Sequence, residues 1–104
     1  MLPKKLKLPI QEMISKKGKS YKNPFFTIKV FSTDKSYSRF GVIVSKKVGK
    51  TAVLRNRIKR MIFNALGLFK DQWPMADYLI ITNSKIVELD QQKINEQFIS
   101  HAFN

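Results

Sequence analysis

The feature that most constrains this sequence is a long amphipathic helix pattern between two strand patterns. In residues 51–66, apolar side chains recur at every third or fourth position, which is typical of a helix that buries one face. Residues 39–45 alternate instead, with Phe40 and Val42 on the same side, and residues 77–82 form a second apolar run of strand length. The sequence therefore predicts a β-α-β unit, which requires a sheet covered by helices.

The start of this helix pattern carries an unusual concentration of positive charge. Cations are normally unfavourable at the N-terminus of a helix, because its unpaired N–H groups already carry partial positive charge. No acidic residue lies between Asp34 and Asp71, so these cations lack the partners that stabilise charged helix surfaces. We therefore expect an anionic ligand to dock here. The basic cluster is defined as Lys46, Lys47, Lys50, Arg55, Asn56, Arg57, Lys59 and Arg60.

The charge of the chain is concentrated in its first part. Residues 1–60 contain 17 Lys and Arg against 2 Asp and Glu, whereas residues 61–104 contain 3 against 5. A surface this basic attracts a polyanion, for which nucleic acid is the first candidate and an anionic membrane surface the second. On the predicted helix, the face opposite the apolar positions carries Asn56, Lys59, Arg60 and Phe63.

Two segments before the β-α-β unit have clear patterns. Residues 9–17 begin with a proline and end before Gly18, which is typical of a short helix. Residues 25–31 alternate as a strand whose two sides are both partly apolar, so one side is available to contact a ligand. One side carries Phe26, Ile28 and Val30, and the other carries Phe25, Thr27, Lys29 and Phe31.

The helix ends complete the predicted fold. Gly67 is placed to end the long helix, and Asp90 is placed to cap a final helix. The predicted order is α-β-β-α-β-α, which gives a single α+β domain over residues 1–104, an α/β sandwich of one mixed sheet and three helices. In the final helix, the side chains predicted to face the core are Ile94, Phe98 and Ala102.

The chain offers little material for catalysis on its own. It has no cysteine, its single histidine, His101, is near the end of the last helix pattern, and its carboxylates are scattered. Glu88 and Asp90 precede a helix, where acids ordinarily act as caps. Residues 49–51 read Gly-Lys-Thr, but the glycine that a phosphate-binding loop needs five positions earlier is replaced by Val44. We therefore expect a binding protein with neither a catalytic residue nor a metal ligand.

The segment from residue 39 to residue 60 resembles the signature of a known family. It reads Arg-Phe-Gly-Val-Ile-Val-Ser-Lys-Lys-Val-Gly-Lys and, after Thr51, Ala-Val-Leu-Arg-Asn-Arg-Ile-Lys-Arg. A strand that ends in Ser-Lys-Lys, followed by Arg-Asn-Arg-x-Lys-Arg on a helix, is similar to the protein subunit of bacterial ribonuclease P. The resemblance extends in order to the N-terminal basic helix, the aromatic strand, the late apolar strand and the closing helix.

This resemblance implies a subunit of a ribonucleoprotein endoribonuclease. A large catalytic RNA with bound Mg²⁺ would remove the 5′ leader from precursor tRNA, and the basic cluster of the protein would face that RNA. A cleft between the sheet and the first helix would hold the single-stranded leader, partly by aromatic stacking. The family also implies a left-handed β-α-β crossover, against the general right-handed rule. The candidate residues of the leader cleft are Phe25, Lys29, Phe31 and Ser45.

Four classes of function remain for comparison with the structure. The leading hypothesis is the RNA-binding subunit, with the catalytic RNA and precursor tRNA as partners and no obligate protein partner. The second is another RNA-binding module, such as a ribosomal protein or an RNA chaperone, which the same charge would serve. A membrane-surface protein is third, because the basic helix buries its apolar side in a core. A stand-alone nuclease is last. The absence of cysteine and of a long apolar segment favours a cytoplasmic protein.

Overall fold

The computed structural model describes residues 6–10 and 17–100 of the chain. Within these residues the chain forms one four-stranded mixed sheet with α-helices packed against it, which confirms the predicted α+β class. The helix predicted over residues 9–17 falls largely on residues 11–16, outside the described residues. His101 and Ala102 also lie outside them.

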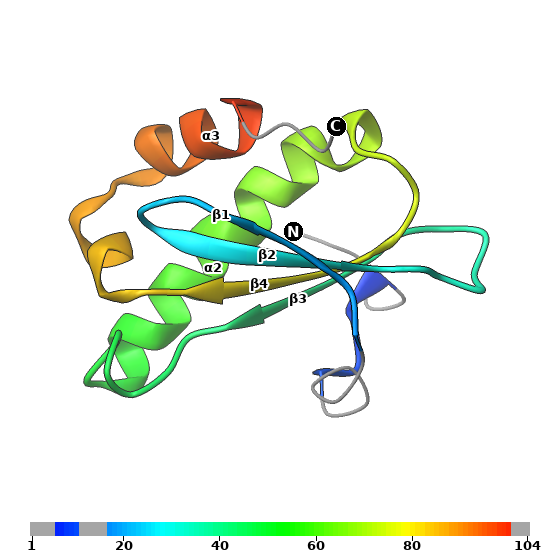
Figure 1. Cartoon of the computed structure of the whole chain (residues 1–104). Coiled ribbons are helices and arrows are strands. Elements are labelled where there is room, and N and C mark those ends of the chain that lie inside the picture. Colours follow the sequence, from blue (N-terminus) through cyan, green and yellow to red (C-terminus); the bar gives the residue numbers. More distant parts are fainter. Residues whose placement is uncertain (1–5, 11–16, 101–104) are drawn as a thin grey trace.

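The sheet is built from strands β1 (Lys19–Lys22), β2 (Phe26–Phe31), β3 (Arg39–Ile43) and β4 (Asp77–Thr82). Their order across the sheet is β1-β2-β4-β3, so the last strand in the chain lies between the two preceding strands (Figure 1). Strand β4 pairs antiparallel with β2 and parallel with β3. The three predicted strands are therefore present, although β2 begins and β3 ends inside the predicted limits.

Strand β1 is the element that the sequence pattern did not predict. It is short and mostly exposed, with the sequence Lys-Ser-Tyr-Lys, so it has no apolar alternation to reveal it. The turn that follows holds it in place. The Asn23 side-chain oxygen accepts hydrogen bonds from the backbone N–H groups of Phe25 (2.8 Å) and Phe26 (2.9 Å). An asparagine turn of this kind reverses the chain and sets the antiparallel pairing of β1 with β2.

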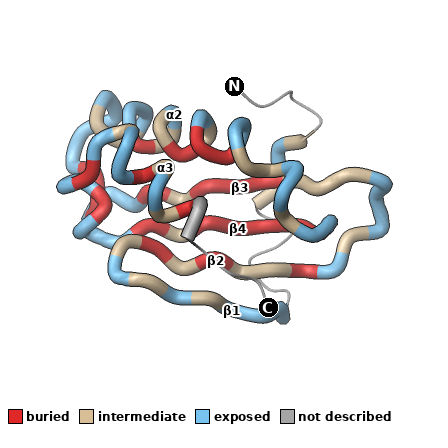
Figure 2. Tube along the Cα trace, turned by 90° about the horizontal axis from the view of Figure 1, so that it is seen from above, coloured by how far each residue is buried: buried red, intermediate tan, exposed pale blue. Residues whose placement is uncertain are grey.

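Helices α2 (Ala52–Phe69) and α3 (Gln91–Ser100) cover the same face of the sheet (Figure 2). Thr51 caps α2, since its side-chain oxygen accepts a hydrogen bond from the Leu54 backbone N–H at 3.1 Å. Asp90 caps α3 in the same way through the Lys93 N–H at 2.9 Å, as predicted. Short 3₁₀ helices, Lys70–Gln72 and Ser84–Glu88, lie on either side of β4.

The predicted end of α2 at Gly67 is wrong. The helix continues to Phe69, and the backbone N–H of Lys70 still donates to the Leu66 carbonyl. Gly67 has no positive φ angle, and a Cβ at this position would meet no atom within 4 Å. The residue is therefore an exposed glycine inside a helix. Its two apolar neighbours, Leu68 and Phe69, extend the helix because Phe69 packs against the core.

The β3-α2-β4 unit crosses over with the rare hand. Strands β3 and β4 are parallel neighbours, and both run from right to left in Figure 1. Figure 2 views the sheet from the helix side, and there the chain leaves β3, passes through the helix layer and returns to β4 so that the crossover is left-handed. The expectation that came from the family resemblance is therefore confirmed, against the general rule for such units.

The main core lies between the sheet and the two helices. It contains the side chains that the strand patterns placed on one side, including Phe26, Ile28, Phe40, Val42 and Val44. The helices contribute Ile58, Ile62, Ala65 and Leu66 from α2 and Ile94 and Phe98 from α3. Burial of this apolar surface supplies most of the driving force for the fold.

The opposite face of the sheet carries a smaller apolar cluster of Leu8, Phe31 and Leu79. The N-terminal segment reaches it along the free edge of β3, where the Leu8 N–H donates to the Phe40 carbonyl at 2.8 Å. Gly41 allows this close approach, because a Cβ at residue 41 would lie 3.0 Å from Ile10 and 3.3 Å from Leu8. Residues 6–10 thus cover part of this face and close one edge of the sheet.

Candidate nucleic-acid interface

The basic cluster lies on the outer side of α2 and in the loop that precedes it. Helix α2 has no acidic residue in its first turn, so nothing there offsets the partial positive charge of the helix N-terminus. Asn56, Arg57 and Arg60 are exposed and Lys59 is half-buried, on the side away from the sheet. The predicted division of this helix into an apolar side and a basic side is confirmed.

The loop between β3 and α2 presents three more cations. The backbone N–H groups of Val48 and Gly49 donate to the Ser45 carbonyl at 3.1 and 2.9 Å, which forms a tight turn. Val48 is buried in the main core and anchors the turn from inside. Apart from the buried Val44, the other side chains of this loop are exposed to solvent. The exposed loop residues are Ser45, Lys46, Lys47 and Lys50.

Arg55 connects this loop to the helix. Its guanidinium Nη1 donates to the Gly49 carbonyl oxygen at 2.8 Å, and the side chain is half-buried. A Cβ at residue 49 would lie 2.7 Å from the Arg55 Cγ, so the contact requires glycine there. Arg55 therefore fixes the position of the loop cations relative to α2, and the rest of its guanidinium fork stays available to an anion.

The ion pairs of the described residues lie away from the basic cluster. Arg39 and Asp77 pair through two hydrogen bonds of 3.1 and 2.7 Å on the sheet, where Asp77 is only 1% exposed. The hydrogen bond to Asp77 raises the pKa of the Arg39 guanidinium above its ordinary value. Lys70 pairs with Asp71 beyond the end of α2. Within the described residues, the cations of the basic cluster therefore have no acidic partner.

A hollow of about 450 Å³ lies against the outer side of α2. An N-terminal residue closes one side of it, since the Lys7 Nζ lies over the Phe63 ring at 5.6 Å from the ring centroid. Sequence patterns placed Asn56, Lys59, Arg60 and Phe63 on one side of the helix, but they missed Lys7 and Asn64. Asn64 was detectable, because it continues the series of Asn56 and Arg60 at intervals of four. The residues that line the hollow are Lys7, Asn56, Lys59, Arg60, Phe63 and Asn64.

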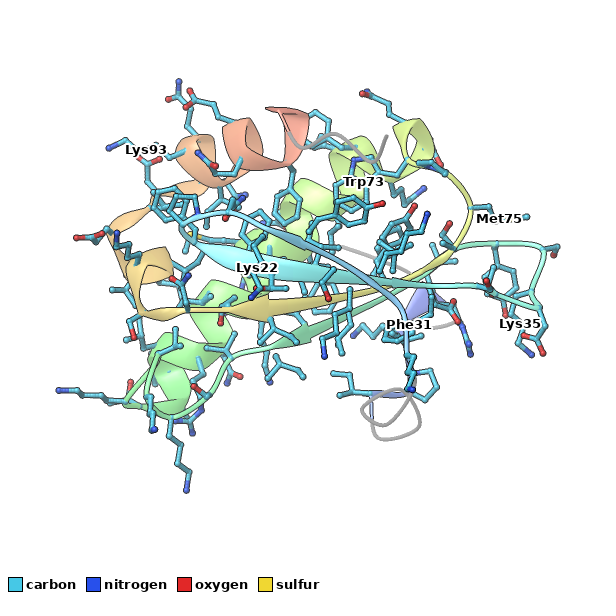
Figure 3. The ribbon with its side chains drawn as sticks, viewed as in Figure 1. Lys22, Phe31, Lys35, Trp73, Met75 and Lys93 are labelled. Atoms are coloured by element: carbon cyan, nitrogen blue, oxygen red, sulfur yellow. The ribbon has the colours of Figure 1, made fainter. Side chains whose placement is uncertain are left out.

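The candidate leader residues are only partly brought together. Lys29 and Phe31 share the sheet face opposite the helices, and Figure 3 shows Phe31 on the side of the N-terminal segment. Ser45 is exposed just beyond β3. Phe25 does not join them, because it precedes β2 and packs against the main core on the helix side. The predicted placement of Phe25 beside Lys29 is therefore wrong, because Phe25 belongs to the Asn23 turn and the strand alternation begins only at Phe26.

This sheet face combines a small apolar cluster with polar neighbours. Lys29 pairs with Ser20 on one side and with Leu79 on the other, and a hollow of about 490 Å³ opens beside Phe31. Phe31 itself is only 4% exposed, so its ring supports the hollow more than it offers a free surface. The lining of this hollow includes two cations, Lys17 and Lys19. The arrangement suits an extended anionic chain with some apolar surface.

Neither surface, as far as the structure describes it, contains a cluster of metal-binding side chains. Within the described residues, no group of three or more His, Cys, Asp or Glu side chains is placed to hold a metal ion. The helices of the described part also lack the length and apolar character needed to cross a membrane. An unneutralised basic surface on a helix, next to a loop of lysines, defines an RNA-binding or DNA-binding protein of the small α+β class.

Comparison with known proteins identifies the family. The profile of the family described as Ribonuclease P matches residues 7–103 of this chain. The chain belongs to the ribonuclease P protein family, whose members are the protein components of a ribonucleoprotein endoribonuclease that processes tRNA. The resemblance of residues 39–60 to the family signature is thereby confirmed.

The similarity to individual members covers most of the chain. The ribonuclease P protein component of Bacillus cereus is 38% identical over 96 residues, which is 88% of this chain and 80% of that protein. The structure of the RNase P protein of Staphylococcus aureus at 2.0 Å aligns with a TM-score of 0.76 at 30% sequence identity. The alignment covers 91% of this chain and 92% of the Staphylococcus aureus chain. The Thermotoga maritima protein has a TM-score of 0.78 at 28% identity, over 89% of this chain and 91% of its own.

Proposed function

We propose that this chain binds the catalytic RNA of ribonuclease P through the basic cluster and so assists the removal of 5′ leaders from precursor tRNA. The observation that carries the proposal is the lack of acidic partners for the cluster within the described residues. Cations that are held in place without partners favour a ligand that brings many phosphates. Arg55 supports this role by fixing the loop lysines beside the helix.

The chemistry in this proposal belongs to the RNA and its Mg²⁺. Magnesium prefers oxygen ligands, and most of its protein ligands are carboxylates. The basic cluster consists of cations around one amide, so it attracts phosphate and repels a divalent metal. We assign to the protein the neutralisation of phosphate charge, which lets two RNA molecules approach each other closely around metal ions held by the catalytic RNA.

The face of the sheet that carries Lys29 is our candidate for the precursor tRNA leader. Lys29 and the cations at the neighbouring hollow supply charge for phosphates, and the hollow beside Phe31 supplies apolar surface for bases. Ser45 follows the end of β3 in the sequence and directly precedes Lys46, the first residue of the basic cluster. The leader would thus extend from the region of the catalytic RNA across the sheet. With these two RNA partners, we propose that the protein acts in the cytoplasm.

A cleavage assay with separated components tests the proposal. Precursor tRNA is incubated at limiting Mg²⁺ with the cognate catalytic RNA, with and without the protein, and also with the protein alone. We expect the protein to raise the cleavage rate of the RNA and to cleave nothing alone. Leader removal by the protein alone contradicts the assignment of the chemistry to RNA, and an unchanged rate in the complete mixture contradicts the proposed function as a whole.

A further inference from the structure

The hollow on the outer side of α2 contains an aromatic ring that charge neutralisation does not require. Phe63 is half-buried, packs against the main core and also lines the hollow. The neighbours of this ring in the hollow are cations and amides, so an apolar surface opens within a basic one. A flat ring of this kind is suited to stack on another flat group, and RNA carries such a group in every base.

Two amide side chains lie in the lining of the hollow with this ring. The Asn64 Nδ2 donates to the Gln91 Oε1 at 3.3 Å, which orients the Asn64 amide by a contact from α3. Within the described part of the chain, the Asn56 amide makes no hydrogen bond, although it lies in the same lining. An amide carries both donors and an acceptor, and this combination matches the polar edge of a nucleobase.

The cations of the hollow are placed for the phosphates on either side of such a base. Lys59 and Arg60 come from α2, and Lys7 comes from the N-terminal segment, so charge is present on two sides. The contact of the Lys7 ammonium with the Phe63 ring, at 5.6 Å, is long and Lys7 is exposed, so it is weak. A base that stacked on this ring would therefore displace the ammonium at little cost, and a phosphate of the same nucleotide would be its new partner.

We propose that this hollow binds one unpaired nucleobase of the RNA, stacked on Phe63, with the amides of Asn56 and Asn64 at its edge. The hollow volume of about 450 Å³ lies within the range of about 300–1,000 Å³ that is typical of small-molecule sites. The proposal rests on the proposed function, because the RNA bound by the basic cluster supplies the base. It adds a base contact to a surface that otherwise reads only phosphates.

Replacement of the ring without a change of charge tests the stack. Phe63→Leu keeps an apolar side chain against the core, Phe63→Tyr keeps the ring, and Phe69→Leu makes the same change on α2 outside the hollow. We expect Phe63→Leu to weaken binding of the catalytic RNA on the order of tenfold, as loss of one base stack does. The salt dependence of binding should not change, because no phosphate contact is lost. Phe63→Tyr and Phe69→Leu should bind like the parent protein.

Crosslinking of the unaltered protein provides a second measurement that does not depend on the folding of a variant. Ultraviolet light joins a base to the aromatic ring it stacks on, and trypsin cleaves after Arg60 and Lys70, so Phe63 is released in a peptide of residues 61–70. Fragment masses then separate Phe63 from Phe69. We expect a single nucleotide attached at Phe63 in the complex with catalytic RNA.

The outcomes separate this proposal from the proposed function. If Phe63→Leu binds and activates like the parent protein, or if the crosslinked nucleotide is found elsewhere, the base site is wrong while the RNA-binding function stands. If the unaltered protein neither binds the catalytic RNA nor raises its cleavage rate, the proposed function fails and the base site fails with it.

Discussion

The two sides of α2 follow different physical rules. The side toward the sheet carries Ile58, Ile62, Ala65 and Leu66, all of them 0% exposed. The outward side carries exposed Asn56, Arg57, Arg60 and Asn64. The first side is determined by shape, because a packed core responds to the loss of a methyl group. The second side is determined by charge and by polar groups such as the Asn56 amide, which makes no hydrogen bond within the described residues, so it responds to ionic strength and to ligands.

We therefore expect stability and the proposed RNA binding to respond to different substitutions within one helix. A substitution on the inner side is expected to lower the fraction of folded molecules and to leave the outer surface of those molecules, which is the proposed RNA-binding side, unchanged. A substitution on the outer side is expected to leave the fold intact and to remove one of the proposed contacts with RNA.

The largest effect is expected on the inner side. Ile62→Ala removes a fully buried side chain from the main core and should lower the free energy of unfolding by about 2–5 kcal/mol. Val53→Ala on the same helix is the control, because Val53 is 79% exposed and its loss should change stability by less than about 0.5 kcal/mol. Denaturant unfolding measures both. Equal losses for the two variants contradict the assignment of the inner side.

The next effect is expected in RNA binding by the outer side. Arg60→Ala and Asn56→Ala should each weaken binding by about 1–2 kcal/mol, because each removes a proposed hydrogen bond to the RNA. They should differ in salt dependence: Arg60→Ala removes a phosphate contact and should lower the log-log slope by about one, whereas Asn56→Ala should leave it unchanged. Binding titrations at several salt concentrations measure both quantities.

Lys35→Ala is the control for this pair. Figure 3 shows Lys35 at the tip of the β2–β3 turn, at the other end of the molecule from the start of α2. As one screened peripheral charge, it should contribute only a few tenths of a kcal/mol. Equal effects for Lys35→Ala and Arg60→Ala would indicate a general attraction between charges in place of a shaped RNA site, and would favour another kind of RNA-binding module.

A third prediction concerns Arg55, which is part of the basic cluster and also makes a structural hydrogen bond to the loop before α2. Arg55→Lys keeps the charge but loses the planar fork that holds the Gly49 carbonyl. The free energy of unfolding should fall by about 1 kcal/mol, as expected for one lost hydrogen bond. RNA binding should weaken as well, because the loop lysines lose their fixed position, while the salt slope stays constant. If stability is unchanged, the bond to Gly49 does not brace the loop.

The parts of the molecule that the sequence predicted are those governed by local pattern. Alternation identified strands β2 and β3, an apolar run of strand length identified β4, and helical spacing identified α2 and its buried side. Strand β1 escaped because four mostly exposed polar residues have no apolar pattern, and only pairing with β2 makes them a strand. The left-handed crossover came from the family resemblance, since no single residue encodes a hand.

The candidate site divides in the same way. The basic cluster was visible because the cations and their lack of acidic neighbours are properties of one segment. Lys7 was missed because its position over Phe63 depends on the N-terminal segment folding back along β3. Phe25 was misplaced because it belongs to the turn at Asn23, and the alternation of β2 begins after that turn. Contacts between segments that are distant in the sequence thus complete a site that local pattern only outlines.

The smallest expected effect is at Gly67, and it has the opposite sign. The sequence pattern placed Gly67 at the end of α2, where a left-handed backbone would make any larger residue unfavourable. The structure places it inside the helix on the exposed side, with open space around the position of a Cβ. Gly67→Ala should therefore raise the free energy of unfolding by about 0.5–1 kcal/mol, because alanine loses less backbone entropy in a helix. Denaturant unfolding decides between the two placements, since loss of stability would mean that α2 ends at Gly67 in solution. RNA binding should stay unchanged, because Gly67 lies beyond Asn64, the last residue of the hollow. An altered affinity would extend the proposed RNA-binding surface along the whole outer side of α2.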